Sequence, residues 1–161
     1  MSFREKILSL DALPGWREAR RARNGKLVVT NGCFDILHVG HVTYLEAARQ
    51  QGDALLVGLN SDSSVRKLKG EGRPLNSESD RAAVLAALEA VTAVCVFPEI
   101  RATRFLSLAQ PDIYVKGGDL SVDQLPEEER DIVAPFGGTI VILGLVPGRS
   151  TTALLEKIAR L

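Results

Sequence analysis

The sequence predicts a doubly wound α/β fold, in which helices cover both faces of one parallel sheet. Short and nearly continuous apolar runs recur along the chain, at residues 27–30, 54–60 and 139–145. Amphipathic helical segments separate these runs, and this alternation is typical of parallel strands that are buried on both faces. Right-handed crossovers between such strands give the doubly wound arrangement. The length of 161 residues suits one domain with a real core.

The chain is expected to begin with a helical lead-in over residues 1–24, followed by a single domain over residues 25–161. Pro14 and Gly15 are expected to break the lead-in helix. Its apolar side chains could pack on the domain itself or form an interface between subunits, and the sequence leaves both open. These side chains are Ile7, Leu8, Leu10, Leu13 and Trp16.

From Lys26 onward, strands and helices are expected to alternate. Gly52 and Pro111 are expected to end two of the helices, whereas Ser77 and Ser150 are expected to cap the starts of two others. The expected strands cover residues 26–31, 54–60, 91–97, 112–116 and 139–145. The expected helices cover residues 41–51, 78–89, 101–109, 126–135 and 151–160, and residues 61–76 are expected to form a polar, basic loop.

The charge balance argues against broad binding to nucleic acids or membrane surfaces, because 20 Lys and Arg residues are matched by 20 Asp and Glu residues. No apolar stretch approaches the length of a membrane span, and the first residues lack the apolar core of a signal peptide. Cys33 and Cys95 have no metal-binding spacing and are expected to be reduced thiols. We therefore expect a cytoplasmic protein that binds neither nucleic acid nor a membrane.

Both histidines of the chain, His38 and His41, fall after the first expected strand and around the start of the next helix. Imidazoles can donate hydrogen bonds to anionic oxygens, and a helix start adds unpaired N–H groups and the positive end of the helix dipole. Gly32 and Gly40 would let the backbone approach a ligand closely. The pair could instead be structural or solvent-facing. A zinc site lacks a third ligand nearby in sequence, and the absence of a G-x-G-x-x-G fingerprint counts against hydride transfer.

Three further segments carry groups that favour anions. Residues 66–73 hold four cations beside glycines, residues 115–119 place a lysine and an aspartate around two glycines, and residues 148–152 place an arginine before a Ser-Thr-Thr helix start. Each segment alone could be a solvated loop, a plain turn or an ordinary capped helix. Because the carboxyl ends of parallel strands meet at one edge of the sheet, together they predict a phosphate-binding site at that edge.

In this order, the motifs resemble those of the cytidylyltransferase-like nucleotidyltransferases, which have a Rossmann-like sheet. The resemblance rests on H-x-G-H, formed by His38, Gly40 and His41, and on the R-S-T-T segment at residues 149–152. Within that superfamily, the chain is most similar to the adenylyltransferase domain of bacterial heptose 1-phosphate enzymes. In many bacteria that domain is fused to a sugar kinase, for which 161 residues leave no room, so the resemblance implies a stand-alone transferase. The closer similarity covers roughly residues 25–160 and lies in residues 30–35, 60–62, 68–70 with 73–74, and 115–119.

The resemblance implies an enzyme that joins a nucleoside triphosphate, foremost ATP, to D-glycero-D-manno-heptose 1-phosphate and releases pyrophosphate, for lipopolysaccharide or surface polysaccharide synthesis. The implied catalytic residues are His38, His41, Lys69 and Arg149, with Lys67 as an alternative to Lys69. The implied nucleotide-binding residues are Thr30, Asn31, Gly32, Cys33, Phe34, Asp35, Gly40, Lys116, Gly117, Asp119, Ser150 and Thr151. The implied substrate-binding residues are Asn60, Asp62, Lys67 and Arg81.

Direct displacement needs no general base here, because the attacking phosphate oxygen is already anionic. Catalysis is therefore expected to come from positioning and from cations aimed at the phosphate oxygens. Mg²⁺ is the implied cofactor, held by phosphates and water with no direct protein ligand, and Asp119 would be an outer-shell partner. The family also implies a homo-oligomer, either a dimer or a tetramer. Two other functions remain open: a CTP-dependent transferase of the glycerol-3-phosphate type, and a nucleotide-binding module without turnover.

Overall fold

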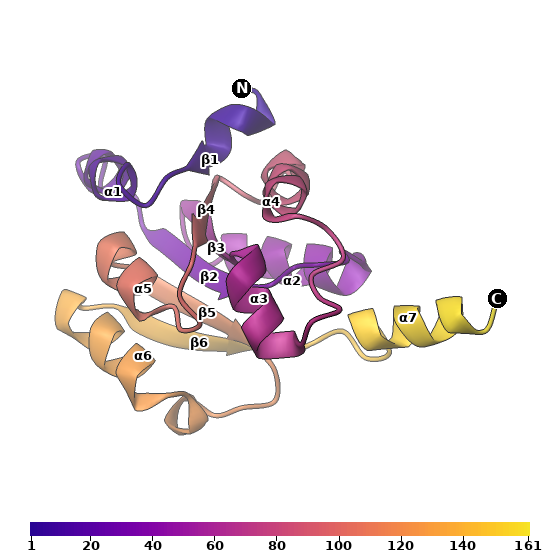
Figure 1. Ribbon diagram of the computed structural model, residues 1–161. Coiled ribbons are helices and arrows are strands. Elements are labelled where there is room, and N and C mark those ends of the chain that lie inside the picture. Colours follow the sequence, from indigo (N-terminus) through magenta and orange to yellow (C-terminus); the bar gives the residue numbers. More distant parts are fainter.

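The computed structural model describes residues 1–161 and shows six parallel strands in one sheet (Figure 1). The strand order is β1-β4-β3-β2-β5-β6, so the chain adds β3 and β4 on one side of β2, and β5 and β6 on the other. The winding therefore reverses between β2 and β5, which confirms the doubly wound, Rossmann-like fold and makes those strands its topological switch point. The strands are β1 (Ile7–Leu8), β2 (Leu27–Gly32), β3 (Ala54–Asn60), β4 (Ala93–Phe97), β5 (Ile113–Gly117) and β6 (Thr139–Leu143).

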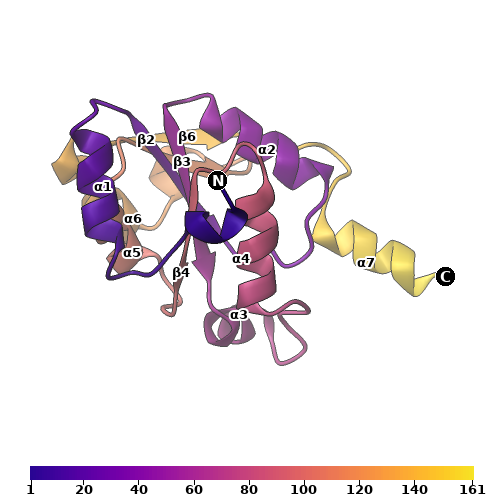
Figure 2. The same cartoon turned by 90° about the horizontal axis from the view of Figure 1, so that it is seen from above.

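Helices cover both faces of the sheet, with α1, α5 and α6 on one side and α2 and α4 on the other (Figure 2). Leu13, Phe105 and Val133 belong to the buried core of the first side, and Leu45 and Leu85 to that of the second. Neighbouring strand residues alternate between these two cores, which explains the continuous apolar runs. The α-helices are α1 (Leu13–Arg21), α2 (Val39–Arg49), α3 (Asp62–Lys69), α4 (Glu78–Ala87), α5 (Thr103–Ala109), α6 (Glu127–Val133) and α7 (Thr151–Ala159). Three short 3₁₀ turns are η1 (Phe3–Lys6), η2 (Val122–Gln124) and η3 (Ala134–Phe136).

The lead-in over residues 1–24 contains more than the expected helix. Its strand β1 pairs with β4 at the edge of the sheet, so this part of the lead-in belongs to the same sheet as the domain. Helix α1 also continues through Pro14 and Gly15 instead of breaking there. Pro14 lies in the first turn of α1, where the missing backbone N–H would have had no helical partner anyway. The buried Arg17 of α1 pairs with Asp112 just before β5, at 3.0 Å.

The second correction concerns the basic loop expected over residues 61–76. Residues 62–69 form helix α3, which begins where the Ser61 hydroxyl accepts a hydrogen bond from the Ser64 N–H. The polar and charged residues of this segment predicted a loop. In the structure, α3 buries Val65 and exposes its cationic side chains, so one buried apolar residue is enough to pack this helix against the core. The expected caps at Ser77 and Ser150 are confirmed. The other predicted helices and strands are present, with ends that differ by a few residues.

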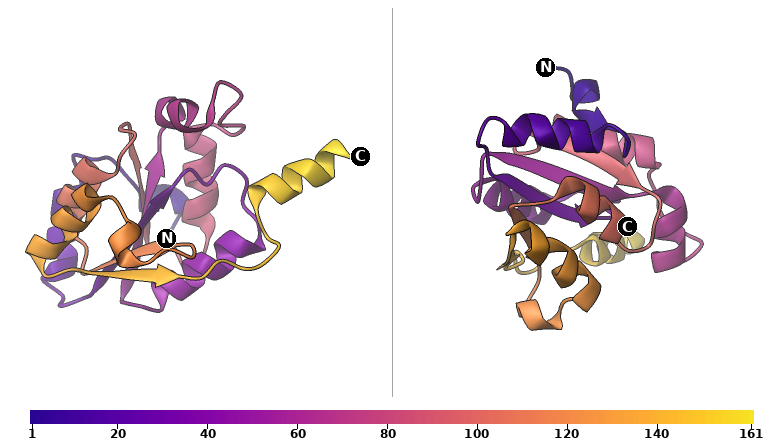
Figure 3. Two further views of the ribbon diagram at one scale, coloured as in Figure 1. Left: turned by 90° about the horizontal axis from the view of Figure 1, so that it is seen from below. Right: turned by 90° about the vertical axis from the view of Figure 1, so that its left-hand side faces the viewer.

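Helix α7 projects from the rest of the molecule and carries the C-terminus (Figures 2 and 3). None of its residues is buried, although its start adjoins the carboxyl edge of the sheet through a bond from the Thr151 hydroxyl to the carbonyl of Ile36. None of the helices is both long enough and apolar enough to pass through a membrane.

Candidate active site

A cleft of about 480 Å³ lies at the switch point, where β2 and β5 end. Its size falls within the usual range of small-molecule sites, and its position is where ligands bind in doubly wound sheets. We call it the switch-point cleft. The predicted site residues that line it are Asn31, Gly32, Cys33, Phe34, Asp35, His38, Gly40, His41, Lys69, Lys116, Gly117, Arg149, Ser150 and Thr151. The four segments singled out in the sequence therefore all contribute to one cleft.

The two histidine rings lie together at the start of α2, with centroids 4.0 Å apart. His38 is the N-cap of α2, and its Nδ1 accepts a hydrogen bond from the Gly40 N–H at 3.1 Å. His41 Nδ1 in turn accepts a bond from the His38 N–H at 3.3 Å. Because a backbone N–H occupies each Nδ1, a neutral ring must carry its own hydrogen on Nε2. The helix start thus fixes both tautomers and leaves two Nε2–H donors for a ligand in the cleft.

Burial and the neighbouring His38 lower the pKa of His41 to about 4. His41 is therefore neutral at pH 7 in the protein without ligand, so it acts there as a donor and not as a cation. Gly40 makes this arrangement possible. A Cβ atom at Gly40 would lie 2.8 Å from the His38 ring and 3.2 Å from the Arg149 Cβ, so any side chain would push the ring or the arginine segment away.

Four cationic side chains line the cleft, from three segments of the chain: Lys69 at the end of α3 with the nearby Arg73, Lys116 at the end of β5, and Arg149 before α7. The single carboxylate among the lining residues is that of Asp35. Lys69 and Arg149 make no ion pair within the protein, and Lys116 pairs with Glu129 at a rather long 3.9 Å. The lining is therefore strongly positive, although the whole chain has a net charge of zero.

Asp35 lines the cleft, but its carboxylate serves the neighbouring loop. Its oxygens accept hydrogen bonds from the N–H groups of Leu75 and Asn76, at 2.7 and 2.9 Å. Arg73 also contacts it, at 3.4 Å. The side chain is only 6% exposed, so the carboxylate anchors the loop after α3 and has little capacity left for a ligand. Asp35 thereby holds Arg73 at the edge of the cleft.

The structure keeps Arg81 away from the cleft. Its side chain is completely buried and donates to the carbonyls of Cys33, Asn60 and Asn76 and to the carboxylate of Asp62. All of its charge and most of its donors are therefore used to tie together the ends of β2 and β3 and the start of α4. Thr30, which bonds to the Tyr44 hydroxyl at 2.7 Å, is buried beneath the cleft. The other predicted residues outside the lining are Asn60, Asp62, Lys67 and Asp119.

Five further residues line the cleft: Tyr44, Arg73, Leu145, Val146 and Thr152. Arg73 and Thr152 belong to segments that the sequence singled out but had no assigned site role, and the other three were not identified. Tyr44 lies one helical turn after His41, so the shared face of α2 was a usable signal. Arg73 belongs to the basic segment over residues 66–73, and together with Pro74 it also carries part of the closer family similarity, which was a usable signal. Leu145 and Val146 follow an apolar strand and carry no local signal of a binding role.

No three side chains of His, Cys, Asp or Glu gather where they could hold a metal ion. Asp119, the predicted outer-shell partner of Mg²⁺, is exposed beyond the end of β5.

Cys33 and Cys95 are free cysteines. Burial raises the pKa of the Cys33 thiol, and this effect outweighs the opposite influence of the nearby Lys69 and Arg81.

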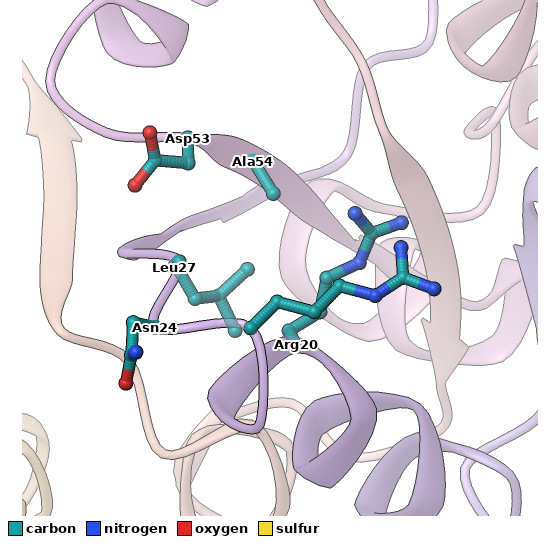
Figure 4. A pocket seen from close by; sticks show the side chains of 7 residues that line it. Arg20, Asn24, Leu27, Asp53 and Ala54 are labelled. Carbon is teal, nitrogen blue, oxygen red and sulfur yellow. The ribbon is translucent and has the colours of Figure 1, made fainter.

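A second and smaller cleft, of about 280 Å³, lies at the opposite end of the strands (Figure 4). It includes Leu27 and Ala54, the first residues of β2 and β3, together with Arg20, Asn24 and Asp53. None of the predicted site residues contributes to it. The switch-point cleft is therefore the candidate active site.

The switch point holds an H-x-G-H helix start and a positive cleft, which suit the phosphates of a nucleotide. This is the arrangement that the resemblance to nucleotidyltransferases implied. The comparison with known families agrees: the model of the family described as "Cytidylyltransferase-like" matches residues 29–144. The chain belongs to the cytidylyltransferase-like family.

Its curated relatives include the bifunctional protein HldE of Pseudomonas fluorescens (strain Pf-5), which is 56% identical over 154 residues. HldE of Ectopseudomonas mendocina (strain ymp) is 55% identical over 152 residues. These matches cover 96% and 94% of this chain but 32% of each relative, so the chain spans about a third of their length. Among solved structures, the lipopolysaccharide core biosynthesis protein of Thermoplasma volcanium GSS1 superposes with a TM-score of 0.61 at 29% identity, covering 76% of this chain and 97% of that chain.

Proposed function

We propose that this chain transfers the adenylyl group of ATP to D-glycero-D-manno-heptose 1-phosphate, giving nucleotide-activated heptose and pyrophosphate for lipopolysaccharide or surface polysaccharide synthesis. The observation that carries the proposal is the convergence of two imidazole donors and four cations on the switch-point cleft. The identity with HldE proteins and the likeness to a lipopolysaccharide core biosynthesis protein support the choice of substrate.

The proposed reaction is an attack by the sugar phosphate oxygen on the α-phosphorus of ATP, which breaks the bond to the pyrophosphate. The attacking oxygen is already anionic near neutral pH, so no residue has to remove a proton. The main barrier is the electrostatic repulsion between the two anions as they approach. The positive lining of the cleft reduces this repulsion. In the proposal, the Nε2–H groups of His38 and His41 donate to oxygens of the reacting phosphates. Arg149, Ser150 and Thr151 hold the leaving pyrophosphate.

Of the two candidate lysines, the proposal assigns the catalytic role to Lys69. Lys69 lines the cleft, whereas Lys67 is exposed on α3 and does not. Lys69 is the last residue of α3 and is followed by Gly70, whose φ of 105° lies in a region that glycine adopts most readily. A lysine next to such a hinge can move towards bound phosphates. Its movement over the phosphates would exclude water from the reaction.

We propose Mg²⁺ as the cofactor. The lining of the cleft fits an ion that arrives with the triphosphate, because its one carboxylate, Asp35, is occupied by the loop after α3. Phosphate oxygens and water would then supply the direct ligands, with Asp119 as an outer-shell partner, because Mg²⁺ usually keeps several waters and binds substrate phosphates. When bound, the ion neutralises charge on the phosphates. The proposal also includes a homo-oligomer, a dimer or a tetramer, that acts in the cytoplasm, where triphosphates are made.

The test is a pyrophosphate-release assay that combines ATP, CTP or GTP with heptose 1-phosphate, other sugar 1-phosphates or glycerol 3-phosphate, with the product identified by mass spectrometry. We expect release with ATP and heptose 1-phosphate. Release only with CTP and glycerol 3-phosphate would support the alternative transferase instead. No release with any pair, together with measurable binding of a triphosphate, would indicate a binding module without turnover.

Two substitutions of His41 test its proposed role. A glutamine amide can place an N–H near the position of Nε2, whereas an asparagine amide reaches only the position of Nδ1. We expect His41→Asn to lower kcat by about 10²–10³-fold, the usual cost of losing one such donor. His41→Gln should retain clearly more activity than His41→Asn. Equal activities of the two variants would contradict the role of the Nε2–H group.

A further inference from the structure

Glu129 is a buried carboxylate that lies behind the wall of the switch-point cleft. It belongs to α6 and is only 6% exposed, and it does not line the cleft. Its Oε2 lies 3.9 Å from the Lys116 ammonium and 3.3 Å from the Tyr114 hydroxyl. The same hydroxyl lies 2.5 Å from the side-chain oxygen of Asn31. Glu129 is therefore connected, directly or through Tyr114, to two residues that do line the cleft.

The first of these residues, Lys116, is held by charge and not by hydrogen bonds. Its ammonium makes no hydrogen bond within the protein, and its single ion-pair partner is Glu129. It also lies over the Tyr114 ring, 5.5 Å from the centroid, where the face of the ring attracts a cation. Lys116 thus has a defined place at the cleft while its N–H donors remain available to a ligand.

The second residue, Asn31, follows the buried part of β2 and is held by Tyr114. The Tyr114 side chain is completely buried, so its hydroxyl is a fixed anchor. The hydroxyl has one hydrogen, and Asn31 and Glu129 are both acceptors within its reach, so the two side chains compete for that hydrogen. A change at Glu129 can therefore reach Asn31 as well as Lys116.

Glu129 lies in the first turn of α6, where the helix dipole favours a negative charge, but stability alone is a weak reason to bury that charge. Removing a charged group from water is costly, and a buried ion pair is often no more stabilising than apolar side chains of similar size. The ion pair of Glu129 is also long, at 3.9 Å, so it is a weak source of stability. What the charge does provide is a fixed location for the Lys116 ammonium.

We propose that Glu129 is a positioning residue for the proposed nucleotidyl transfer: it holds the Lys116 ammonium at the wall of the cleft, and it sets how the Tyr114 hydroxyl shares its hydrogen with Asn31. It does so without touching substrate. The inference rests on the proposed function, because the value of both positions lies in binding the phosphates or the nucleotide.

The first experiment separates charge from shape. Glu129→Gln keeps the size of the side chain and an acceptor for Tyr114 but removes the charge, whereas Glu129→Asp keeps the charge on a shorter side chain. We expect Glu129→Gln to lower kcat/KM for ATP about tenfold and Glu129→Asp to retain more activity than Glu129→Gln. Glu127→Gln, the same change at an exposed position of α6, is the matched control and should match the wild type. Thermal melting of each variant checks that it is folded.

The second experiment asks whether the effect passes through Lys116. In a Lys116→Met background, Glu129→Gln should change kcat/KM by less than about twofold, because no ammonium is left to position. Tyr114→Phe tests the other branch, and its loss of activity should largely disappear in an Asn31→Ala background. The same fold loss in both backgrounds would show a structural role and overturn the inference.

The two proposals fail in different ways. A wild-type protein that releases no pyrophosphate in the full panel overturns the proposed function, and this inference with it. A wild-type protein that turns over normally, with Glu129→Gln equally active, overturns this inference alone.

Discussion

At the scale of single residues, the chemistry of His41 depends on two contacts that its neighbours supply. The His38 N–H occupies Nδ1, and burial beside the His38 ring lowers the pKa of His41 to about 4. The unfolded chain should have a pKa near the ordinary 6.5 for this residue. The difference between the two states makes the stability of the protein depend on pH.

His41 is expected to make the ligand-free protein less stable as the pH falls from about 7 to 4. In that window the unfolded chain binds a proton at His41 that the folded protein does not, so the free energy of unfolding falls with falling pH. His41→Asn removes this contribution, and its melting temperature should fall less steeply over the same range. Melting curves of both proteins at several pH values measure the difference. Parallel curves for the two proteins would show that His41 has an ordinary pKa in the fold.

Arg81 is the residue whose role differs most from its expected one, since it braces three segments and does not reach the cleft. Arg81→Met removes a fully buried cation and leaves Asp62 and three carbonyls without their donor. We expect a loss of about 3–5 kcal/mol in the free energy of unfolding, measured by urea denaturation. Arg66→Met is the control, because Arg66 is exposed and its contact with Glu71 is 4.0 Å long. That change should cost less than about 1 kcal/mol, and similar losses for both variants would contradict the bracing role.

At the scale of elements, α3 and the loop over residues 70–76 connect the end of β3 to α4. The loop is anchored at its far end by Asp35, while Gly70 and Gly72 near its start have no contact that a Cβ atom would meet. One end of the loop is therefore fixed to Asp35, whereas residues 69–72 around its start are exposed. Such a segment can bring Lys69 over a bound triphosphate without disturbing the core.

Asp35→Asn should loosen this anchor while leaving the core intact. An asparagine has one acceptor oxygen and no charge, so it cannot hold Arg73 and both backbone N–H groups as the carboxylate does. We expect faster hydrogen exchange at the amides of Leu75 and Asn76, and a KM for ATP raised by about tenfold. The exposed Asp11→Asn serves as the matched control. Unchanged exchange at those two amides would show that the carboxylate is not the anchor.

At the scale of the whole molecule, a chain with no net charge concentrates four cations in one cleft. The protein therefore attracts anions at this cleft and not over its whole surface. The affinity of the cleft should increase with the negative charge of the ligand. The field of these cations is screened by salt, because part of the cleft is open to water.

Nucleotides should stabilise the protein in the order triphosphate, diphosphate, monophosphate. At a free ATP concentration of about 100 times Kd, binding should add about 2.7 kcal/mol to the free energy of unfolding. Higher ionic strength should weaken the effect most for the triphosphate. Thermal shift assays across the three nucleotides and several salt concentrations provide the test. An equal shift for AMP and ATP would mean that the cations do not bind the phosphates.

The fold was largely predictable because its signals are local. Buried parallel strands require continuous apolar runs, and helix starts require side-chain caps such as Ser77 and Ser150. The errors have local causes too. Pro14 is compatible with a first helical turn, and the polar residues of α3 concealed a helix with few buried side chains. The two-residue strand β1 is too short for any pattern to indicate, and only its pairing with β4 defines it.

By itself, the sequence determined the parallel sheet, the segments that form the cleft and the presence of two imidazoles at a helix start. Each depends on neighbouring residues, so spacing and composition are sufficient. The tertiary structure alone decided which cationic side chains line the cleft and which are buried inside the protein. Arg73 and Arg81 have the same side chain and lie only eight residues apart, yet the first lines the cleft and the second is buried beneath four hydrogen-bonding partners. That difference arises from the packing of segments distant in the chain, and no local pattern records it.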